Sequence, residues 1–333
     1  MRAWVAPRYG PPEVLRLVEM ADPVPGPGEV VVRVRAIGLN FADCAARLGV
    51  YPRVPRPPFV PGMEVAGVVT AIGEGVDRAL EGALVAAVPI FGGHAEAVRV
   101  RASNVRPLPP GIDATVGAAV TVTGITADHA LRTVGRVRAG ERVVITAAAG
   151  GVGTMLVQLA AASGAEGIAV ASTPAKRELA LRLGAVAAFG YEAYREAVRG
   201  GVDVILDSVG GKLFRTGWRA LRGDGRYVLF GLAAGMGRRR VAWLRAVREV
   251  ASMGVVIPSL LVSPCRTLAG FNLSLVPHLA AEMHERFQRT LTAVAAGTLE
   301  PVIGATFPFA ELPRAHALLQ GRGSVGKVVV TVP

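Results

Sequence analysis

Hydrophobic positions follow two different patterns along the chain, and the pattern changes near residue 120. Before that point the apolar residues form short runs of strand length, which are separated by turn signals rich in proline and glycine. The runs cover residues 30–36, 65–72, 85–88 and 94–100. Several short strands with such punctuation predict a compact β domain that resembles a barrel.

Beyond residue 120, runs typical of strands alternate with patterns typical of helices. Strands are predicted at 143–147, 167–171, 203–206, 226–230 and 268–273. Helices are predicted at 154–163 and 174–183, and Ser172 and Thr173 are cap candidates for the second. This alternation predicts a parallel sheet with right-handed crossovers.

The C-terminal part of the chain returns to a β pattern after a long helix. The predicted order is a helix at 279–296, a β run at 301–309, a short helix at 311–319 and a last strand at 327–332. A terminal strand in this position can rejoin the sheet of the N-terminal domain. The expected fold class is therefore α/β, with a doubly wound parallel sheet and a separate β domain.

A glycine-rich loop follows the first strand of the alternating region. Residues 147–153 read Ala-Ala-Ala-Gly-Gly-Val-Gly and lead into a helical pattern. In the dinucleotide fingerprint G-x-G-x-x-G, Ala148, Gly150 and Gly153 take the three glycine places, so the first glycine is missing. Its position between a strand and a helix still predicts a cofactor loop, in which Gly150, Gly151 and Val152 approach a pyrophosphate. A tight turn without a ligand is the alternative.

The end of the second strand indicates which dinucleotide binds. An NAD-binding unit usually has an acidic residue there for the ribose 2′-hydroxyl. This chain has Ser172, Thr173 and Lys176 instead, which suit a 2′-phosphate. We therefore expect NADPH, with a solvated lysine at a helix start as the alternative.

Composition excludes several other classes of protein. Two cysteines, Cys44 and Cys265, cannot form a disulfide framework or a cysteine-rich zinc site. No apolar run is long enough to span a bilayer and no signal peptide is evident, so a cytoplasmic protein is expected. The net charge of +12 comes mainly from scattered arginines, which makes nucleic acid or an acidic membrane an unlikely partner.

Five segments of the sequence resemble one known family. They are Gly38–Asp43 with Arg47, Gly49 and Tyr51, then Pro61–Val69, Ala147–Gly153, Val204–Gly211 and Gly326–Val329. Together they resemble the zinc-independent quinone oxidoreductases of the medium-chain dehydrogenase/reductase superfamily. The nearest branch holds vesicle amine transport protein and zeta-crystallin, to which Gly270–Leu273 also points.

The resemblance implies a GroES-like β-barrel catalytic domain formed by both ends of the chain, residues 1–120 and 279–333. A Rossmann NADPH-binding domain, 121–278, is then inserted between them. It further implies a nicotinamide in the cleft between the domains and a homodimer.

The resemblance also implies chemistry without a metal. Zinc-dependent relatives have a cysteine where this chain has Asn40, a histidine where it has Met63, and a third ligand near Ala119. Without a Lewis acid, a quinone or an α,β-unsaturated carbonyl is the suitable hydride acceptor, because its negative charge spreads onto an oxygen. Asn40 and Tyr51 are the expected catalytic residues, with Tyr51 as donor to that oxygen. Asp43 and Arg47 form a structural ion pair in the alternative interpretation.

Further cofactor contacts carry over by position. They are Asn40, Thr126, Tyr191, Val209, Phe230, Gly231, Leu232, Phe271, Asn272, Leu273 and Lys327. The resemblance places Phe230–Leu232 and Phe271–Leu273 near the nicotinamide. It also implies that Lys327 approaches the cofactor from the C-terminal segment.

Two other functions and one segment stay open at this point. The chain could be an enoyl-thioester reductase, or an NADPH-binding interaction protein that associates with RNA or membranes. Residues 235–264 match no motif. Core packing is the first interpretation of their apolar part, and closure of a substrate cleft or a dimer contact are the alternatives.

Overall fold

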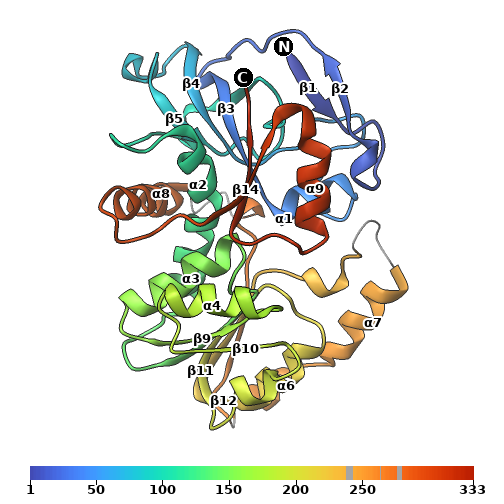
Figure 1. Ribbon diagram of the computed structural model, residues 1–333, viewed down its shortest axis with the longest axis vertical. Coiled ribbons are helices and arrows are strands. Elements are labelled where there is room, and N and C mark those ends of the chain that lie inside the picture. Colours follow the sequence, from blue (N-terminus) through green and yellow to red (C-terminus); the bar gives the residue numbers. More distant parts are fainter. Residues whose placement is uncertain (238–242, 263, 276–279) are drawn as a thin grey trace. The chain divides into compact units, whose positions relative to one another are not determined.

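The structure is a computed structural model that describes the 333-residue chain except residues 238–242, 263 and 276–279 (Figure 1). The chain forms two compact units. The first holds Met1–Ile125 and the described part of His278–Pro333, and the second holds Thr126–Gly237 and the described part of Val241–Pro277. We refer to them as the β unit and the Rossmann unit.

A seven-stranded sheet forms the frame of the β unit. Its strands are β3 (Glu29–Leu39), β4 (Val65–Ile72), β5 (Leu84–Ala87), β6 (Ala97–Arg101), β7 (Val105–Pro107), β14 (Ile303–Pro308) and β15 (Lys327–Thr331), in the order β14-β15-β3-β4-β5-β7 with β6 also on β3. β15 is antiparallel to β3, and Val328 lies opposite Leu39. The predicted return of the last strand to the N-terminal sheet is therefore confirmed.

Side-chain alternation along the strands builds the core of this unit. In β3, Val30, Val32 and Val34 are fully buried while Arg33 between them is exposed. The period of two places one face of the strand in the core and the other in water. A small hairpin of β1 (Arg2–Val5) and β2 (Arg16–Glu19) joins the unit, and the Trp4 indole N–H donates to the Phe309 carbonyl at 2.9 Å.

Helices of the β unit connect and cover the strands. They are α1 (Phe41–Arg47), α8 (Ala280–Ala295) and α9 (Leu312–Gln320), with 3₁₀ turns η1 (Pro12–Val14), η2 (Arg78–Leu80), η3 (Ala102–Asn104) and η9 (Phe309–Glu311). The helix α2 (Ala114–Asp128) continues as a π-helical turn, η4 (His129–Val134).

A parallel six-stranded sheet forms the Rossmann unit. Its strands are β8 (Arg142–Thr146), β9 (Glu166–Val170), β10 (Ala187–Phe189), β11 (Val202–Asp207), β12 (Leu221–Leu229) and β13 (Thr267–Gly270), in the order β10-β9-β8-β11-β12-β13. Chain order reverses between β8 and β11, the point at which doubly wound sheets bind ligands. In β8, Val143, Val144 and Ile145 are all fully buried, as expected for a strand that is covered on both faces.

Short helices follow most strands of this sheet. They are α3 (Gly151–Ala162), α4 (Pro174–Arg182), α5 (Tyr194–Ala197), α6 (Lys212–Ala220) and α7 (Trp243–Met253), with 3₁₀ turns η5 (Ala233–Gly235), η6 (Pro258–Leu261) and η7 (Leu273–Leu275). The α/β class with a doubly wound parallel sheet is confirmed. Among the residues that the structure describes, no helix has both the length and the apolar composition to cross a bilayer.

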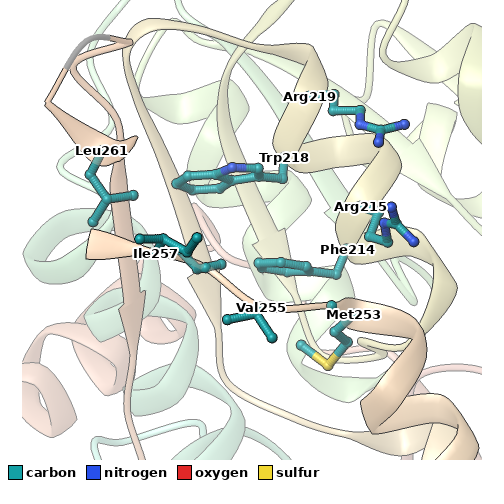
Figure 2. Close-up of a pocket in the computed structure, with 10 residues that line it drawn as sticks. Phe214, Arg215, Trp218, Arg219, Met253, Val255, Ile257 and Leu261 are labelled. Carbon is teal, nitrogen blue, oxygen red and sulfur yellow. The ribbon is translucent and has the colours of Figure 1, made fainter. Parts of the chain in front are cut away.

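The apolar segment after α7 only partly follows the sequence interpretation. Core packing is predicted for it, and Val256 packs against the core of the Rossmann unit, but Val255 is 90% exposed and Ile257 is 52% exposed. Gly254, with φ +78°, ends α7, and the chain then runs along the surface over α6. The result is a groove of about 410 Å³. Figure 2 shows Phe214 and Trp218 in its apolar wall.

Candidate functional site

The glycine loop closes tightly against its own strand. Ala147 takes a left-handed conformation with φ +49°, and its carbonyl accepts the Gly150 N–H at 2.9 Å. A Cβ on Gly153 would lie 2.2 Å from that same carbonyl oxygen, so only glycine fits there. Ala148, at the place of the missing first glycine, has an ordinary φ and donates its N–H to Val170 at 3.1 Å. The loop therefore keeps its shape without the first glycine.

The helix that follows the loop is suited to an anion. α3 starts directly after Gly150, which gives no side-chain cap, and its first turn holds no acidic residue. The N–H groups of Gly151, Val152 and Gly153 therefore lie at the positive end of the helix dipole. This is the arrangement that binds a pyrophosphate in dinucleotide-binding units.

A buried aspartate joins the two strands at the switch point. Asp207, at the end of β11, is fully buried, and its Oδ1 accepts the Thr146 hydroxyl at 2.7 Å and the Val209 N–H at 2.8 Å. Its Oδ2 accepts the Tyr227 hydroxyl at 2.6 Å. Burial, reinforced by the Asp207 charge, raises the pKa of Tyr227, which keeps this phenol a donor. These bonds fix the loop after β11.

Sequence reasoning missed Asp207. The residue lies within Val204–Gly211, a segment used for the resemblance, but no role was assigned to it. The signal in the sequence was a single acidic residue at the end of a run that is otherwise apolar, Val-Ile-Leu-Asp.

The segment that follows β9 carries hydroxyl-bearing and basic side chains. Thr173 caps α4, and its hydroxyl accepts the Lys176 N–H at 3.3 Å, while Ser172 beside it is exposed. Lys176 is half-buried, and this burial lowers its pKa. Arg177, which the sequence analysis did not select, is also half-buried and donates to the Ala171 carbonyl at 3.4 Å. The strand end therefore brings two basic residues together without an acidic one.

Aromatic residues meet at the ends of β12 and β13. The rings of Phe230 and Phe271 are stacked, with centroids 5.8 Å apart and planes inclined by 16°. The buried His129 places its ring edge-on to Phe271 at 4.6 Å. The structure thus unites two residues expected beside a nicotinamide and adds His129, for which the sequence indicated no role.

Except for Thr126, the other predicted cofactor residues of this unit follow the carboxyl ends of strands at the same edge of the sheet. Tyr191 follows β10, Val209 follows β11, and Gly231 and Leu232 follow Phe230; Asn272 and Leu273 follow Phe271, and Thr126 lies in α2. Asn272 Oδ1 accepts the Ser274 hydroxyl at 2.8 Å, and Leu232 is half exposed. Parallel strands bring their carboxyl ends to one edge, which explains why residues so far apart in sequence gather there.

In the β unit, the amide of Asn40 is hydrogen-bonded to protein groups through both its nitrogen and its oxygen. Asn40 lies directly after β3, and its Oδ1 accepts from Lys327 Nζ at 2.8 Å. Its Nδ2 donates to the Gly38 carbonyl at 3.1 Å and to Glu64 Oε2 at 3.0 Å. Because a primary amide has two N–H bonds, both are already used.

Glu64 is the centre of this network. It is fully buried, and its Oε2 lies 2.5 Å from Lys327 Nζ, whose side chain is only 4% exposed. Its Oε1 accepts the backbone N–H of Val122 in α2 at 2.6 Å. A Cβ on Gly38 would lie 1.9 Å from the Ala118 carbonyl, so glycine lets α2 approach this strand. The sequence analysis assigned Glu64 no role, although it lies in the Gly-Met-Glu segment used for the resemblance.

Asp43 and Arg47 do not form the ion pair that the alternative interpretation expected. The Asp43 carboxylate accepts the Asn40 backbone N–H at 2.8 Å, whereas Arg47 donates to the Gly10 carbonyl at 3.1 Å and to Gln320 Oε1. Burial raises the pKa of Asp43 to about 7, partly offset by the Asn40 N–H and by Lys327. Tyr51 is half-buried and packs against the core of this unit.

The residues at the three zinc-ligand places do not fit a zinc ion. Met63 and Ala119 are buried thioether and methyl groups, and the oxygen of Asn40 is already bound to the Lys327 ammonium. Zinc in proteins takes thiolate, imidazole or carboxylate ligands. In the part of the chain that the structure describes, no three residues of the His, Cys, Asp and Glu types are arranged to hold a metal.

Two known families match this chain. The family described as alcohol dehydrogenase GroES-like domain matches residues 26–133, and the one described as zinc-binding dehydrogenase matches residues 183–330. The first confirms the GroES-like character of the β unit. The second carries zinc in its description, but the residues above are unsuited to that ion.

Relatives cover nearly the whole chain. It is 33% identical to the synaptic vesicle membrane protein VAT-1 homolog of Rattus norvegicus, over 92% of this chain and 78% of the relative. It is 29% identical to the quinone oxidoreductase of the same species, over 99% of this chain and 97% of the relative. A solved quinone oxidoreductase of Thermus thermophilus, also determined in complex with NADPH, is 37% identical with a TM-score of 0.83, over 99% of this chain and 100% of that chain.

A parallel sheet with a glycine loop at its carboxyl edge, in one chain with a GroES-like unit, defines an oxidoreductase of the dinucleotide-binding type. The chain belongs to the medium-chain dehydrogenase/reductase superfamily, in the branch of the quinone oxidoreductases and VAT-1 homologues. The resemblance stated from the sequence is confirmed.

Proposed function

We propose that this protein transfers a hydride from NADPH to quinones or α,β-unsaturated carbonyl compounds without a metal. The observation that carries the proposal is the carboxyl edge of the parallel sheet. There a pyrophosphate-type loop lies one strand away from a strand end with hydroxyls, two basic residues and no acid. The solved relative from Thermus thermophilus that binds NADPH supports the same cofactor.

In this proposal, the Rossmann unit holds the cofactor through contacts that the residues fit. The N–H groups of α3 bind the pyrophosphate, and Lys176 and Arg177 bind the 2′-phosphate with Ser172 and Thr173. The stacked pair Phe230 and Phe271 borders the nicotinamide. The remaining contacts are Thr126, Tyr191, Val209, Gly231, Leu232, Asn272 and Leu273, with Asn40 and Lys327 from the β unit. When bound, NADPH supplies the hydride.

The reacting oxygen needs a hydrogen-bond donor in place of a metal. Both N–H bonds of Asn40 are already used within the protein, so Tyr51 is the proposed donor to the substrate oxygen. A quinone or an enone suits such a site, because the charge that develops is delocalised and one or two donors stabilise it. A simple alcohol or ketone would need stronger polarisation.

The test is NADPH oxidation followed at 340 nm with a panel of 1,4-benzoquinone, larger quinones, simple enones and an enoyl thioester. We expect saturable turnover with at least one quinone or enone, and a rate with Tyr51→Phe that is lower by tenfold or more. Turnover with the thioester alone would favour an enoyl-thioester reductase. An absence of turnover across the panel would refute the proposal.

We also propose that the protein is a homodimer in the cytoplasm. Among the described residues β13 is an edge strand of the parallel sheet, and an edge strand can pair with the same strand of a second copy. Both cysteines are unpaired thiols, which suits a reducing compartment. Sedimentation velocity tests the first part, and a monomer at micromolar concentration would contradict it.

A further inference from the structure

One carboxylate, that of Glu64, holds together several segments of the β unit around Asn40. Glu64 receives hydrogen bonds from the amide of Asn40 after β3, from the backbone of α2 at Val122 and from the ammonium of Lys327 at the start of β15. Lys327 in turn binds the oxygen of Asn40. The three side chains therefore form a closed ring of contacts in which none can rotate alone.

We propose that Glu64 is a positioning residue for hydride transfer: it fixes the Lys327 ammonium against Asn40, and this cation stands beside a place where zinc-dependent relatives have a metal ligand. The proposal rests on the proposed function and deepens it. It assigns a role to Glu64 and gives Lys327 the task of supplying fixed positive charge at a site whose residues do not fit zinc.

Desolvation explains why this pair calls for a function. Glu64 is fully buried and the Lys327 side chain is 4% exposed, so both charges have lost their water. A buried ion pair is seldom a better stabiliser than two apolar side chains of the same size. The three hydrogen bonds of Glu64 and the two of Lys327 offset part of the cost, but they do not require a charge at this place.

The donor count shows what the ammonium can add. Lys327 carries three N–H bonds, and the described residues give it two acceptors, Asn40 Oδ1 and Glu64 Oε2. Two fixed partners also determine where the third N–H points. In a site with little water, a fixed cation stabilises the negative charge that develops on an electrophile's oxygen without reorganisation during the reaction.

The experiment compares Glu64→Gln, Lys327→Met and the double variant E64Q/K327M with the wild type. The measurements are the melting temperature, the NADPH dissociation constant by fluorescence, and kcat and KM for NADPH with a quinone. Glu141→Gln is the matched control, because Glu141 pairs with the buried Arg226 at 2.6 Å in the Rossmann unit, away from the proposed contacts.

Each single variant should lower the melting temperature, since it leaves one buried group without its partner. Each should also lower kcat/KM by about tenfold to a hundredfold, as the loss of orienting partners does at other sites. The double variant should regain most of the melting temperature but keep a kcat within threefold of K327M. E141Q should lower the melting temperature and leave kcat unchanged.

Recovery of kcat together with the melting temperature in the double variant would overturn the proposal, because the pair would then serve the fold alone. If K327M does not fold, Lys327→Arg is measured in its place. Because this variant keeps the positive charge, its kcat should exceed that of the double variant. If the wild type binds NADPH but reduces no acceptor, the proposed function fails, and the NADPH dissociation constant decides the inference. A rise of at least fivefold in the double variant would support it, and an unchanged constant would refute it.

Discussion

The candidate cofactor site of the Rossmann unit is formed mostly by backbone, whereas the polar cluster around Asn40 in the β unit is formed by buried charged side chains. In the first, the glycine loop and the ends of parallel strands place N–H groups at one edge of a sheet. In the second, Glu64 and Lys327 meet from positions that are 263 residues apart in sequence. The difference shows that the proposed cofactor loop depends on local geometry, while the polar cluster of the β unit depends on long-range pairing.

The largest effect is expected where the backbone has no room to adapt. Gly153→Ala would place a Cβ 2.2 Å from the Ala147 carbonyl oxygen and 2.7 Å from the Ala148 carbonyl carbon. Both contacts are with backbone, so the loop must open. We expect the NADPH dissociation constant to rise by about a hundredfold or more, because the open loop would lose two good hydrogen bonds to a charged group. Gly150→Ala is the control, because its Cβ would lie 3.3 Å from its nearest neighbour, and the constant should rise far less.

Removing the charge at the switch point should have the next largest effect. Asp207→Asn turns an amide N–H₂ toward groups that are themselves donors, among them the Tyr227 hydroxyl and the Gly210 N–H. We expect the free energy of unfolding to fall by about 2–3 kcal/mol, because the substitution leaves buried polar groups without hydrogen-bond partners. Asp203→Asn, in the same strand but half-buried, should lower it by less than half as much in the same urea titration. Equal losses would show that Asp207 has no special place in the unit.

A smaller effect should separate the two cofactors. Lys176→Ala with Arg177→Ala removes both basic residues at the end of β9 and leaves the glycine loop intact. The NADPH dissociation constant should rise by about tenfold to thirtyfold, as the loss of charge-assisted bonds to a phosphate predicts, while that of NADH stays within twofold. A parallel rise for both cofactors would place the 2′-phosphate elsewhere.

The last predicted effect is a change of slope, the pH dependence of stability contributed by Asp43. Its folded pKa, about 7, lies above the ordinary value of 3.8. Between these two values the folded state holds a proton that the unfolded state has lost, so this contribution to stability is complete below pH 4 and disappears as the pH rises through 7. Asp43→Asn should therefore show a flatter loss of unfolding free energy from pH 4 to 7 than the wild type.

Other buried groups set the background for that comparison. Burial lowers the pKa of His94 to about 3 and that of His316 well below its ordinary value, so both act in the opposite direction and lower stability below pH 6.5. They are present in both proteins, and the difference between the two curves belongs to Asp43. Identical slopes would contradict the raised pKa.

Sequence periodicity was sufficient for most of the fold, because each strand carries its own pattern. The bounds predicted for β4, 65–72, are those observed. The helix predicted at 174–183 differs from the observed α4, Pro174–Arg182, by one residue. β10 was missed, since three residues, Ala-Ala-Phe, are too few to show a period. The exposed apolar stretch after α7 was assigned to the core because composition alone does not tell which face of a segment is covered.

The site divides in the same way. The glycine loop and the Ser172–Lys176 cluster could be predicted because the residues proposed to act together are neighbours in sequence. Glu64 and Asp207 were not, because their importance comes from partners brought by other elements, such as Lys327 and Tyr227. A single buried acid in an apolar run is the signal to look for.

Metal-free hydride transfer from NADPH is best tested by the kcat/KM ratio of NADPH to NADH with 1,4-benzoquinone, measured on protein dialysed against a zinc chelator. Such transfer predicts saturable turnover, a preference for NADPH of at least tenfold, and no gain when zinc is added back. A preference for NADH, or activity that returns only with zinc, would contradict it.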